Sequence, residues 1–218
     1  MLEREVSRAV YWPGDTFLCF RASQRDIMEQ RIDDLELIGR VKAGDIDAYA
    51  DLVRRHHPAV MSLCMGMLAD KAAAEDVAQE TFLKAYASLK DFRGDAAFST
   101  WLYRIASNKC LDAGRKISRA KTQSLDSLLE GNNEALQRLA AAPGPERALE
   151  DAQLVEQILS CLPDAYRLIL TLRELQGLTY EEIAVAMSCT VDSVKARLQR
   201  ARKEFLDQLR HFAAPENV

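Results

Sequence analysis

Apolar side chains recur at helical spacing along most of the chain. Near its beginning, four of them follow one another every three residues: Ile32, Leu35, Ile38 and Val41. Gly44 is expected to end this helix, because glycine readily adopts the left-handed conformation that closes a helix. Asp45 then caps a second helix, Pro58 opens a third and Asp70 caps a fourth. A fifth helix, from Thr100 to about Lys116, completes a first half that is predicted to be helical throughout.

The second half shows the same spacing. Helices are expected over residues 146–159 and from Pro163 to Gly177, followed by a short helix and a long one. The long helix places six apolar side chains on one face: Val191, Val194, Leu198, Ala201, Phe205 and Leu209. Glycine and proline occupy only 9 and 6 of the 218 positions, which disfavours a turn-rich β sandwich. The predicted fold class is therefore all-α.

Helix-breaking residues separate the two halves. Gly131-Asn132-Asn133 and the run from Ala141 to Pro145 lie between them, and neither fits inside a long helix. We therefore predict two small helical domains joined by a flexible linker. The expected divisions are a flexible N-terminal extension at 1–27, a first domain at 28–120, the linker at 121–145, a second domain at 146–212 and a C-terminal tail at 213–218.

The net charge of −4 is distributed unevenly. Residues 93–121 contain seven basic and two acidic side chains, a local charge of +5, whereas residues 122–157 contain two basic and seven acidic ones, a local charge of −5. Patches of opposite sign steer different partners, although two solvated faces would give the same pattern. A chain with 48% hydrophobic and 28% charged residues is expected to fold rather than to be disordered.

Several classes of protein are disfavoured by what the sequence lacks. No apolar run is long enough to cross a bilayer, and the charged first twenty residues do not resemble a secretory signal, so we expect a cytoplasmic protein without membrane insertion. The five cysteines include no close pair and are interpreted as reduced, buried thiols. His56 and His57 are adjacent on a helix and therefore make a poor chelate for a metal. No metal or other cofactor is expected.

The sharpest local motif lies near the end of the chain. Thr179 and Glu182 form a capping box, and a turn at residues 188–190 leads into the long helix. The outer face of that helix is polar and basic: Ser193, Lys195, Arg197, Gln199, Arg200, Arg202 and Lys203. This combination favours a helix-turn-helix whose second helix enters the DNA major groove. The alternative is a solvated amphipathic helix in a bundle.

Two further segments carry candidate chemistry. Between Phe92 and Lys109, aromatic residues alternate with Arg and Lys, a pattern that can grip a single strand by stacking and phosphate contacts, although core packing is the competing interpretation. A second segment forms a polar strip with one apolar member: Asp76, Gln79, Glu80 and Leu83. This strip either docks a partner helix or faces water.

The same segments carry a family resemblance. The run EDVAQETFLKAY, then FRGDAAFSTWLYRIASNKCLD, and later LPDAYRLILTLRELQGLTYEEIA and SVKARLQRARKEF closely resemble the extracytoplasmic-function (ECF, group IV) sigma factors of bacterial RNA polymerase. The resemblance extends from about Asp34 to Leu209, in order and with matching spacing. It implies two helical domains, regions 2 and 4, and a stress-responsive transcription initiation factor that is not an enzyme.

The resemblance also assigns functions to residues. The strip Asp76, Gln79, Glu80 and Leu83 matches the segment that docks on the clamp helices of the polymerase β′ subunit. Contacts to the −10 promoter element, and its melting, are implied for Phe92, Arg93, Phe98, Ser99, Thr100, Trp101, Arg104, Asn108, Lys109 and Arg115. Contacts to the −35 element are implied for Thr179, Ser193, Lys195, Arg197, Gln199, Arg200 and Lys203. The implied partners are core polymerase, including its β flap, promoter DNA and an anti-sigma factor.

The chain also departs from the family pattern. Asp192, Ser193 and Val194 stand where many members have Gly-Thr-Val, and Ala196 replaces a frequent serine, which changes the expected −35 base preference. The first 27 residues have no counterpart in the family. Two other functions are weighed against the resemblance: a free-standing helix-turn-helix regulator, which would bind duplex DNA without polymerase, and a helical hydrolase, for which no catalytic set is present.

Overall fold

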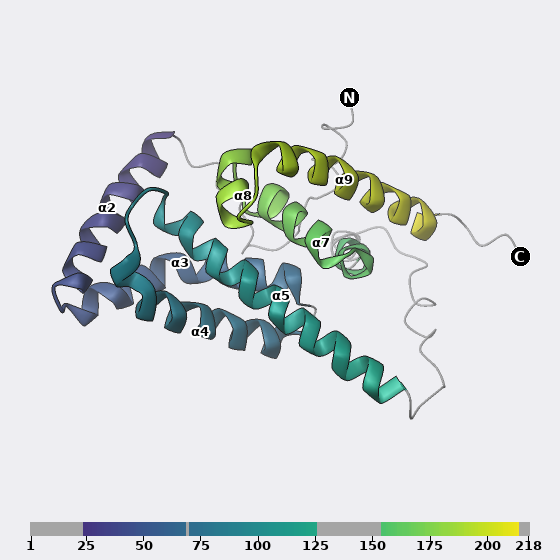
Figure 1. Ribbon diagram of the computed structural model, residues 1–218, viewed down its shortest axis with the longest axis horizontal. Coiled ribbons are helices and arrows are strands. Elements are labelled where there is room, and N and C mark those ends of the chain that lie inside the picture. Colours follow the sequence, from purple (N-terminus) through teal and green to yellow (C-terminus); the bar gives the residue numbers. More distant parts are fainter. Residues whose placement is uncertain (1–23, 69, 126–153, 214–218) are drawn as a thin grey trace, which may run out of the picture.

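The computed structural model describes residues 24–68, 70–125 and 154–213, and their side chains from 33 to 117 and from 154 to 212 apart from residue 69 (Figure 1). The first domain has four α-helices and one short 3₁₀ turn: α2 (Gln24–Lys42), α3 (Ile46–Met67), α4 (Lys71–Ser88), η1 (Leu89–Asp91) and α5 (Phe98–Leu125). The second contains a helical segment at 154–161, α7 (Asp164–Leu170), the π-helical turn η3 (Thr171–Leu175), α8 (Tyr180–Ala186) and α9 (Val191–Ala213). The described residues contain no strand, which confirms the all-α prediction.

The predicted helix boundaries rest on side-chain caps that the structure confirms. Asp45 accepts a hydrogen bond from the Ala48 N–H at the start of α3, and Asp70 accepts one from the Ala73 N–H at the start of α4. Thr179 begins α8 with the predicted capping box. Such caps satisfy N–H groups that the first turn of a helix leaves without a partner.

Two predicted boundaries are wrong. Pro58 does not open a helix but lies inside α3, which continues from Ile46 to Met67. Proline removes the hydrogen bond to the carbonyl of Arg54, and both residues are exposed, so water can satisfy that carbonyl. The fifth helix is also longer than expected, because α5 continues to Leu125, beyond the start of the predicted linker. The rest of that linker, residues 1–23 of the N-terminal extension and most of the tail lie outside the described residues, whereas residues 24–27 of the predicted extension already belong to α2.

Helix α3 is the centre of the first domain. It packs against α2, α4 and α5, and Leu52, Val60 and Leu63 are almost completely buried along it. Cys64 of α3 meets Cys110 of α5 with 3.7 Å between the sulfur atoms, and their contact together with burial raises the pKa of the Cys110 thiol. The sequence gives no sign of this proximity, since 46 residues separate the two thiols. The buried-thiol prediction does not extend to Cys161, which is exposed.

The second domain packs directly on the first (Figure 1). Gln176 joins them through both ends of its amide, because Oε1 accepts from the Tyr103 hydroxyl at 2.9 Å and Nε2 donates to Ser62 Oγ at 2.8 Å. Gly66 of α3 lets Thr171 come close, since a Cβ on this glycine would lie 2.9 Å from the Thr171 methyl group. The described parts of the two domains are therefore in direct contact, with α8 packed against α5 and with α7 and η3 packed against α3.

None of the helices within the described ranges is sufficiently long and apolar to cross a membrane.

Candidate functional site

The predicted polymerase-binding strip lies on the exposed face of α4. The opposite face of this helix is buried through Val77, Phe82 and Ala85, and the helical repeat therefore turns Asp76, Gln79, Glu80 and Leu83 together toward solvent. Leu83 is 65% exposed and is the one apolar member of this four-residue strip.

Tyr86 extends this strip, although the sequence analysis did not include it. It lies three residues after Leu83 and is 46% exposed. Its ring packs at 4.8 Å from the ring of Tyr49, whose hydroxyl donates to the Phe82 carbonyl at 2.5 Å. The sequence signal for Tyr86 is its spacing of three residues from Leu83, because residues three apart are neighbours on the surface of a helix. An apolar pair, Leu83 and Tyr86, thus lies beside the acidic residues of the strip.

The predicted −10 residues divide into a buried set and an exposed set. Phe92, Phe98 and Thr100 are 6%, 1% and 2% exposed, so in this conformation they are core residues and cannot contact DNA. The rings of Phe92, Phe98 and Trp101 pack together with centroids 5.3 to 5.8 Å apart. Lys42 Nζ of α2 donates a hydrogen bond to the Phe92 carbonyl oxygen at 2.8 Å. This hydrogen bond ties α2 to the backbone beside the aromatic cluster.

The remaining −10 candidates lie at or near the surface. Arg93 is exposed, and Ser99 and Trp101 are half-buried. Trp101, Arg104, Asn108 and Arg115 follow steps of three, four and seven residues and therefore share one side of α5. Lys109 is turned toward α4, where its ammonium group binds Glu80. Of the two interpretations that the sequence left open, core packing holds for Phe98, whereas Trp101 is half-buried and Arg104 is exposed.

The predicted −35 residues gather mainly around a groove along α9. Val194, Leu198, Ala201 and Phe205 are buried, as the apolar stripe predicts. The groove combines apolar and mostly basic side chains, and it is lined by Tyr180, Lys195, Leu198, Gln199, Arg200, Arg202, Lys203, Leu206, Asp207 and Arg210.

The other −35 candidates have different surroundings. Ser193 and Arg197 are half-buried and do not line the groove. The Thr179 hydroxyl donates to Glu182 Oε2 and accepts from the Glu182 N–H, so it is occupied by the helix cap. Thr190 Oγ1 accepts from the Ser193 N–H and begins α9 directly after the turn. Two short-linked helices with the second one basic outside are thus present, as a helix-turn-helix requires.

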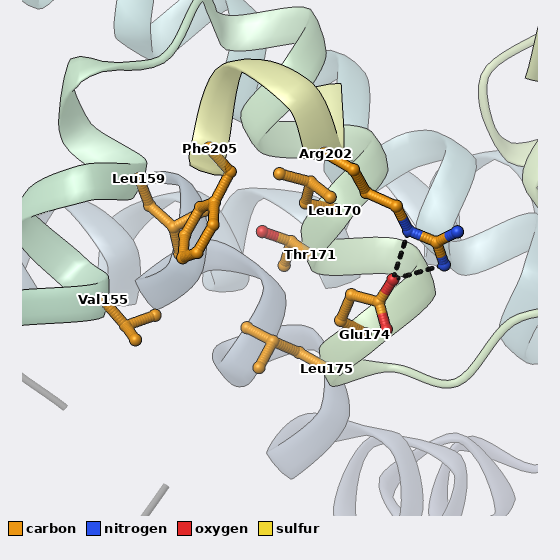
Figure 2. A pocket seen from close by; sticks show the side chains of 8 residues that line it. All are labelled: Val155, Leu159, Leu170, Thr171, Glu174, Leu175, Arg202 and Phe205. Carbon is orange, nitrogen blue, oxygen red and sulfur yellow. Dashed lines mark hydrogen bonds and ion pairs between the residues drawn. The ribbon is translucent and has the colours of Figure 1, made fainter. Parts of the chain in front are cut away.

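A separate apolar pocket lies within the second domain (Figure 2). Its lining consists of Val155, Leu159, Leu170, Thr171, Glu174, Leu175, Arg202 and Phe205. Figure 2 shows Arg202 pointing toward Glu174, and their ion pair measures 2.8 Å. None of the candidates implied for the −10, −35 or polymerase contacts lines this pocket, and Arg202 of the predicted basic face lines both this pocket and the α9 groove.

His56 and His57 have separate partners. His56 is buried, with Nε2 2.9 Å from Asp34 Oδ2, and its ring meets Phe98 edge-on. His57 is exposed and stacks on Phe82. The two imidazoles therefore take part in packing between helices, in line with the prediction that adjacent histidines point in different directions.

Comparisons with known proteins agree with this arrangement. A family described as Sigma-70 region 2 matches residues 52–120, and one described as Sigma-70, region 4 matches residues 152–205. Among solved structures, CnrH in complex with the cytosolic domain of CnrY has a TM-score of 0.60 at 24% identity and covers 82% of this chain and 98% of that one. The sigma factor RpoE in complex with the anti-sigma factor NepR, from Bartonella quintana, has a TM-score of 0.58 at 25% identity, over 74% and 96%.

Curated relatives are more similar in sequence. The RNA polymerase sigma-H factor of Pseudomonas aeruginosa is 40% identical over 177 residues, which are 78% of this chain and 90% of the relative. The ECF RNA polymerase sigma-E factor of Escherichia coli K12 is 39% identical over 183 residues, 81% of this chain and 94% of the relative. The two helical domains and the helix-turn-helix thus define a sigma-70-type protein.

The chain belongs to the ECF sigma factors of RNA polymerase. These are transcription initiation factors and not enzymes, so neither the hydrolase nor the free-standing regulator is favoured.

Proposed function

We propose that the chain binds core RNA polymerase through the exposed strip of α4, contacts the −10 element through α5 and the −35 element through α9, and promotes opening of the promoter. The observation that carries this proposal is the separation of three exposed surfaces over two domains. The α4 strip is acidic and apolar, whereas the exposed sides of α5 and α9 are basic. Basic surfaces bind phosphates, and an acidic and apolar strip fits a protein partner.

For the polymerase, the α4 strip offers the chemistry of a helix-docking surface. Leu83 and Tyr86 supply apolar area, and Asp76, Gln79 and Glu80 surround it with hydrogen-bonding groups. Such an apolar centre with a polar rim is typical of protein interfaces. We assign it to the β′ clamp helices, and we assign a second contact, with the β flap, to the region 4 domain.

For melting, Trp101 is the aromatic side chain that supports a stacking role. It is half-buried, and it shares its side of α5 with Arg104 and Asn108. A base stacked on Trp101, with Arg104 at a phosphate, would hold one strand unpaired. Phe98 has no part in this contact, because its ring lies in the core. There it packs against Trp101, with the two ring centroids 5.6 Å apart.

An anti-sigma factor is the third proposed partner. Support comes from the RpoE structure, in which the sigma factor is in complex with the anti-sigma factor NepR. Because the two domains are in direct contact, one partner can also reach surfaces of both. We therefore expect one regulatory protein to contact region 2 and region 4 together.

The polymerase contact is tested by replacing Asp76 and Gln79 by alanine. We expect the affinity for core polymerase to fall by about 1 to 2 kcal/mol, because two polar groups of the interface are lost while the buried face of α4 is untouched. Competition against a fluorescent wild-type chain measures this loss. Glu75→Ala is the matched control on the same helix, and unchanged affinity of the double variant at equal helicity would contradict the assignment.

The −35 contact is tested by Arg200→Ala. Arg200 is exposed and lines the groove of α9, so its guanidinium can reach a base edge or a phosphate. If it forms a bidentate contact with a guanine, promoter binding by holoenzyme should weaken by about 1 to 3 kcal/mol and the preference at one base pair should relax. Binding to a set of −35 variants measures both effects. An equal loss on every variant would assign Arg200 to the phosphate backbone.

A further inference from the structure

Two thiols in the core of the first domain are in direct contact. The Cys110 thiol of α5 donates to Cys64 Sγ of α3, with the two sulfur atoms 3.7 Å apart. Both residues are 0% exposed, and so is Ala106, which lies one turn before Cys110 on α5. A disulfide has a sulfur–sulfur distance of about 2.0 Å, so the sulfurs must approach by about 1.7 Å, which small rotations of the two side chains can supply.

The second domain packs on the side of α5 that carries Cys110. Tyr103 and Gly114 share this side, since they lie seven residues before and four residues after Cys110. The Tyr103 hydroxyl donates to Gln176 Oε1 at 2.9 Å. A Cβ on Gly114 would lie 3.6 Å from Asp164 Oδ2. Cys110 therefore lies between two points at which α5 meets the second domain.

The second domain also meets α3 close to Cys64. Met67, three residues further along, accepts a hydrogen bond at its carbonyl from Arg167 at 2.9 Å. Contact with Cys64 and then burial raise the pKa of the Cys110 thiol, which is therefore protonated at neutral pH. A protonated thiol is a poor nucleophile. Oxidation of this pair therefore requires that the thiols first become exposed.

We propose that Cys64 and Cys110 are a reversible disulfide site for peroxide and that the docked second domain shields this site. In the first step, the thiolate of one cysteine attacks peroxide: a sulfur–oxygen bond forms, the oxygen–oxygen bond breaks, and hydroxide leaves and takes up a proton. In the second step, the other sulfur attacks the sulfenic acid, so that the disulfide bond forms and water leaves. The two thiols lose two electrons and two protons, and peroxide is reduced to two waters.

The consequence is an oxidation rate that depends on the contact between the domains. When the reaction is slow compared with opening and closing, its rate follows the fraction of chains in which the site is open. The disulfide would tie α5, which carries Arg104 and Asn108 of the proposed −10 surface, to the central helix α3. A thiol reductant would reverse it. The site itself requires neither polymerase nor DNA.

The disulfide is tested in the full chain with Cys19, Cys161 and Cys189 replaced by serine, so that only the proposed pair can react. After treatment with hydrogen peroxide and alkylation of free thiols, we expect an unalkylated chain that has lost two hydrogen atoms. A digest should contain a peptide that joins Cys64 to Cys110, and dithiothreitol should restore both thiols. Cys64→Ala in the same background is the matched control and should give no such internal cross-link.

Shielding is tested by Gln176→Ala in this background, which removes two hydrogen bonds between the domains. We expect the disulfide to form about tenfold faster, and about threefold faster in Tyr103→Phe, which removes only one of them. Arg210→Met, on the exposed side of α9, should leave the rate unchanged. Equal rates in all these chains, at equal far-UV helicity, would overturn the shielding. Absence of the cross-linked peptide from every chain, Gln176→Ala included, would overturn the disulfide site itself.

Discussion

Replacing Phe98 by alanine is expected to lower the free energy of unfolding by about 3 to 5 kcal/mol. Phe98 is 1% exposed, and its ring contacts His56, Phe92 and Trp101. Its removal would leave a cavity between α3 and α5 that these rigid rings cannot fill, so both apolar burial and ring contacts are lost. Urea unfolding followed by far-UV circular dichroism measures the change.

Leu83→Ala provides the matched control, because it removes an apolar side chain that is 65% exposed. Its effect on stability should remain within about 0.5 kcal/mol. A loss below about 1 kcal/mol for Phe98→Ala would contradict the placement of Phe98 in the core and would return it to the set of residues available for stacking on DNA.

Replacing Arg167 by methionine is expected to destabilise the second domain by at least about 3 kcal/mol. Its guanidinium donates to four backbone carbonyls, those of Leu159, Ser160 and Leu162 in the second domain and that of Met67 in α3. Methionine keeps the aliphatic part of the side chain but donates no hydrogen bond, so the carbonyls lose a charged donor. Thermal unfolding monitored by calorimetry measures the loss.

Arg210→Met is the control for this variant. Arg210 is exposed on α9 and pairs with Asp207 at 2.8 Å, so its removal should change stability by less than about 0.5 kcal/mol. Arg167→Lys, which retains the charge but not the planar set of donors, should fall between the two. Equal stability of Arg167→Met and Arg210→Met would show that Arg167 does not hold the two domains together.

Local signals predicted most of the helices. The Asp45 and Asp70 caps, the capping box of α8 and the apolar stripe of α9 depend on residues a few positions apart, and the structure confirms each of them. The prediction that Pro58 opens a helix is wrong, because proline favours the first turn of a helix but is also tolerated inside a helix where its neighbours face water. The difference depends on exposure, which the local sequence does not show.

The candidate surfaces were predictable only in part. All four residues of the α4 strip are exposed, as a helix with one buried face requires. For the aromatic segment, the sequence could not separate stacking from core packing, and the structure places Phe98 in the core and leaves Trp101 half-buried. Contacts between distant polar residues carry no periodic signal, and the bridge from Gln176 to Ser62 and Tyr103 was therefore not foreseen.

The central claim is that this chain directs core RNA polymerase to promoters. The most direct measurement is in vitro transcription of fragmented genomic DNA of the source organism with core polymerase, with and without the purified full chain, followed by sequencing of transcript 5′ ends. We predict starts that depend on the chain and that share two conserved upstream elements at a fixed separation. The same 5′ ends with and without the chain, although the chain is folded and the polymerase is active, would contradict the account.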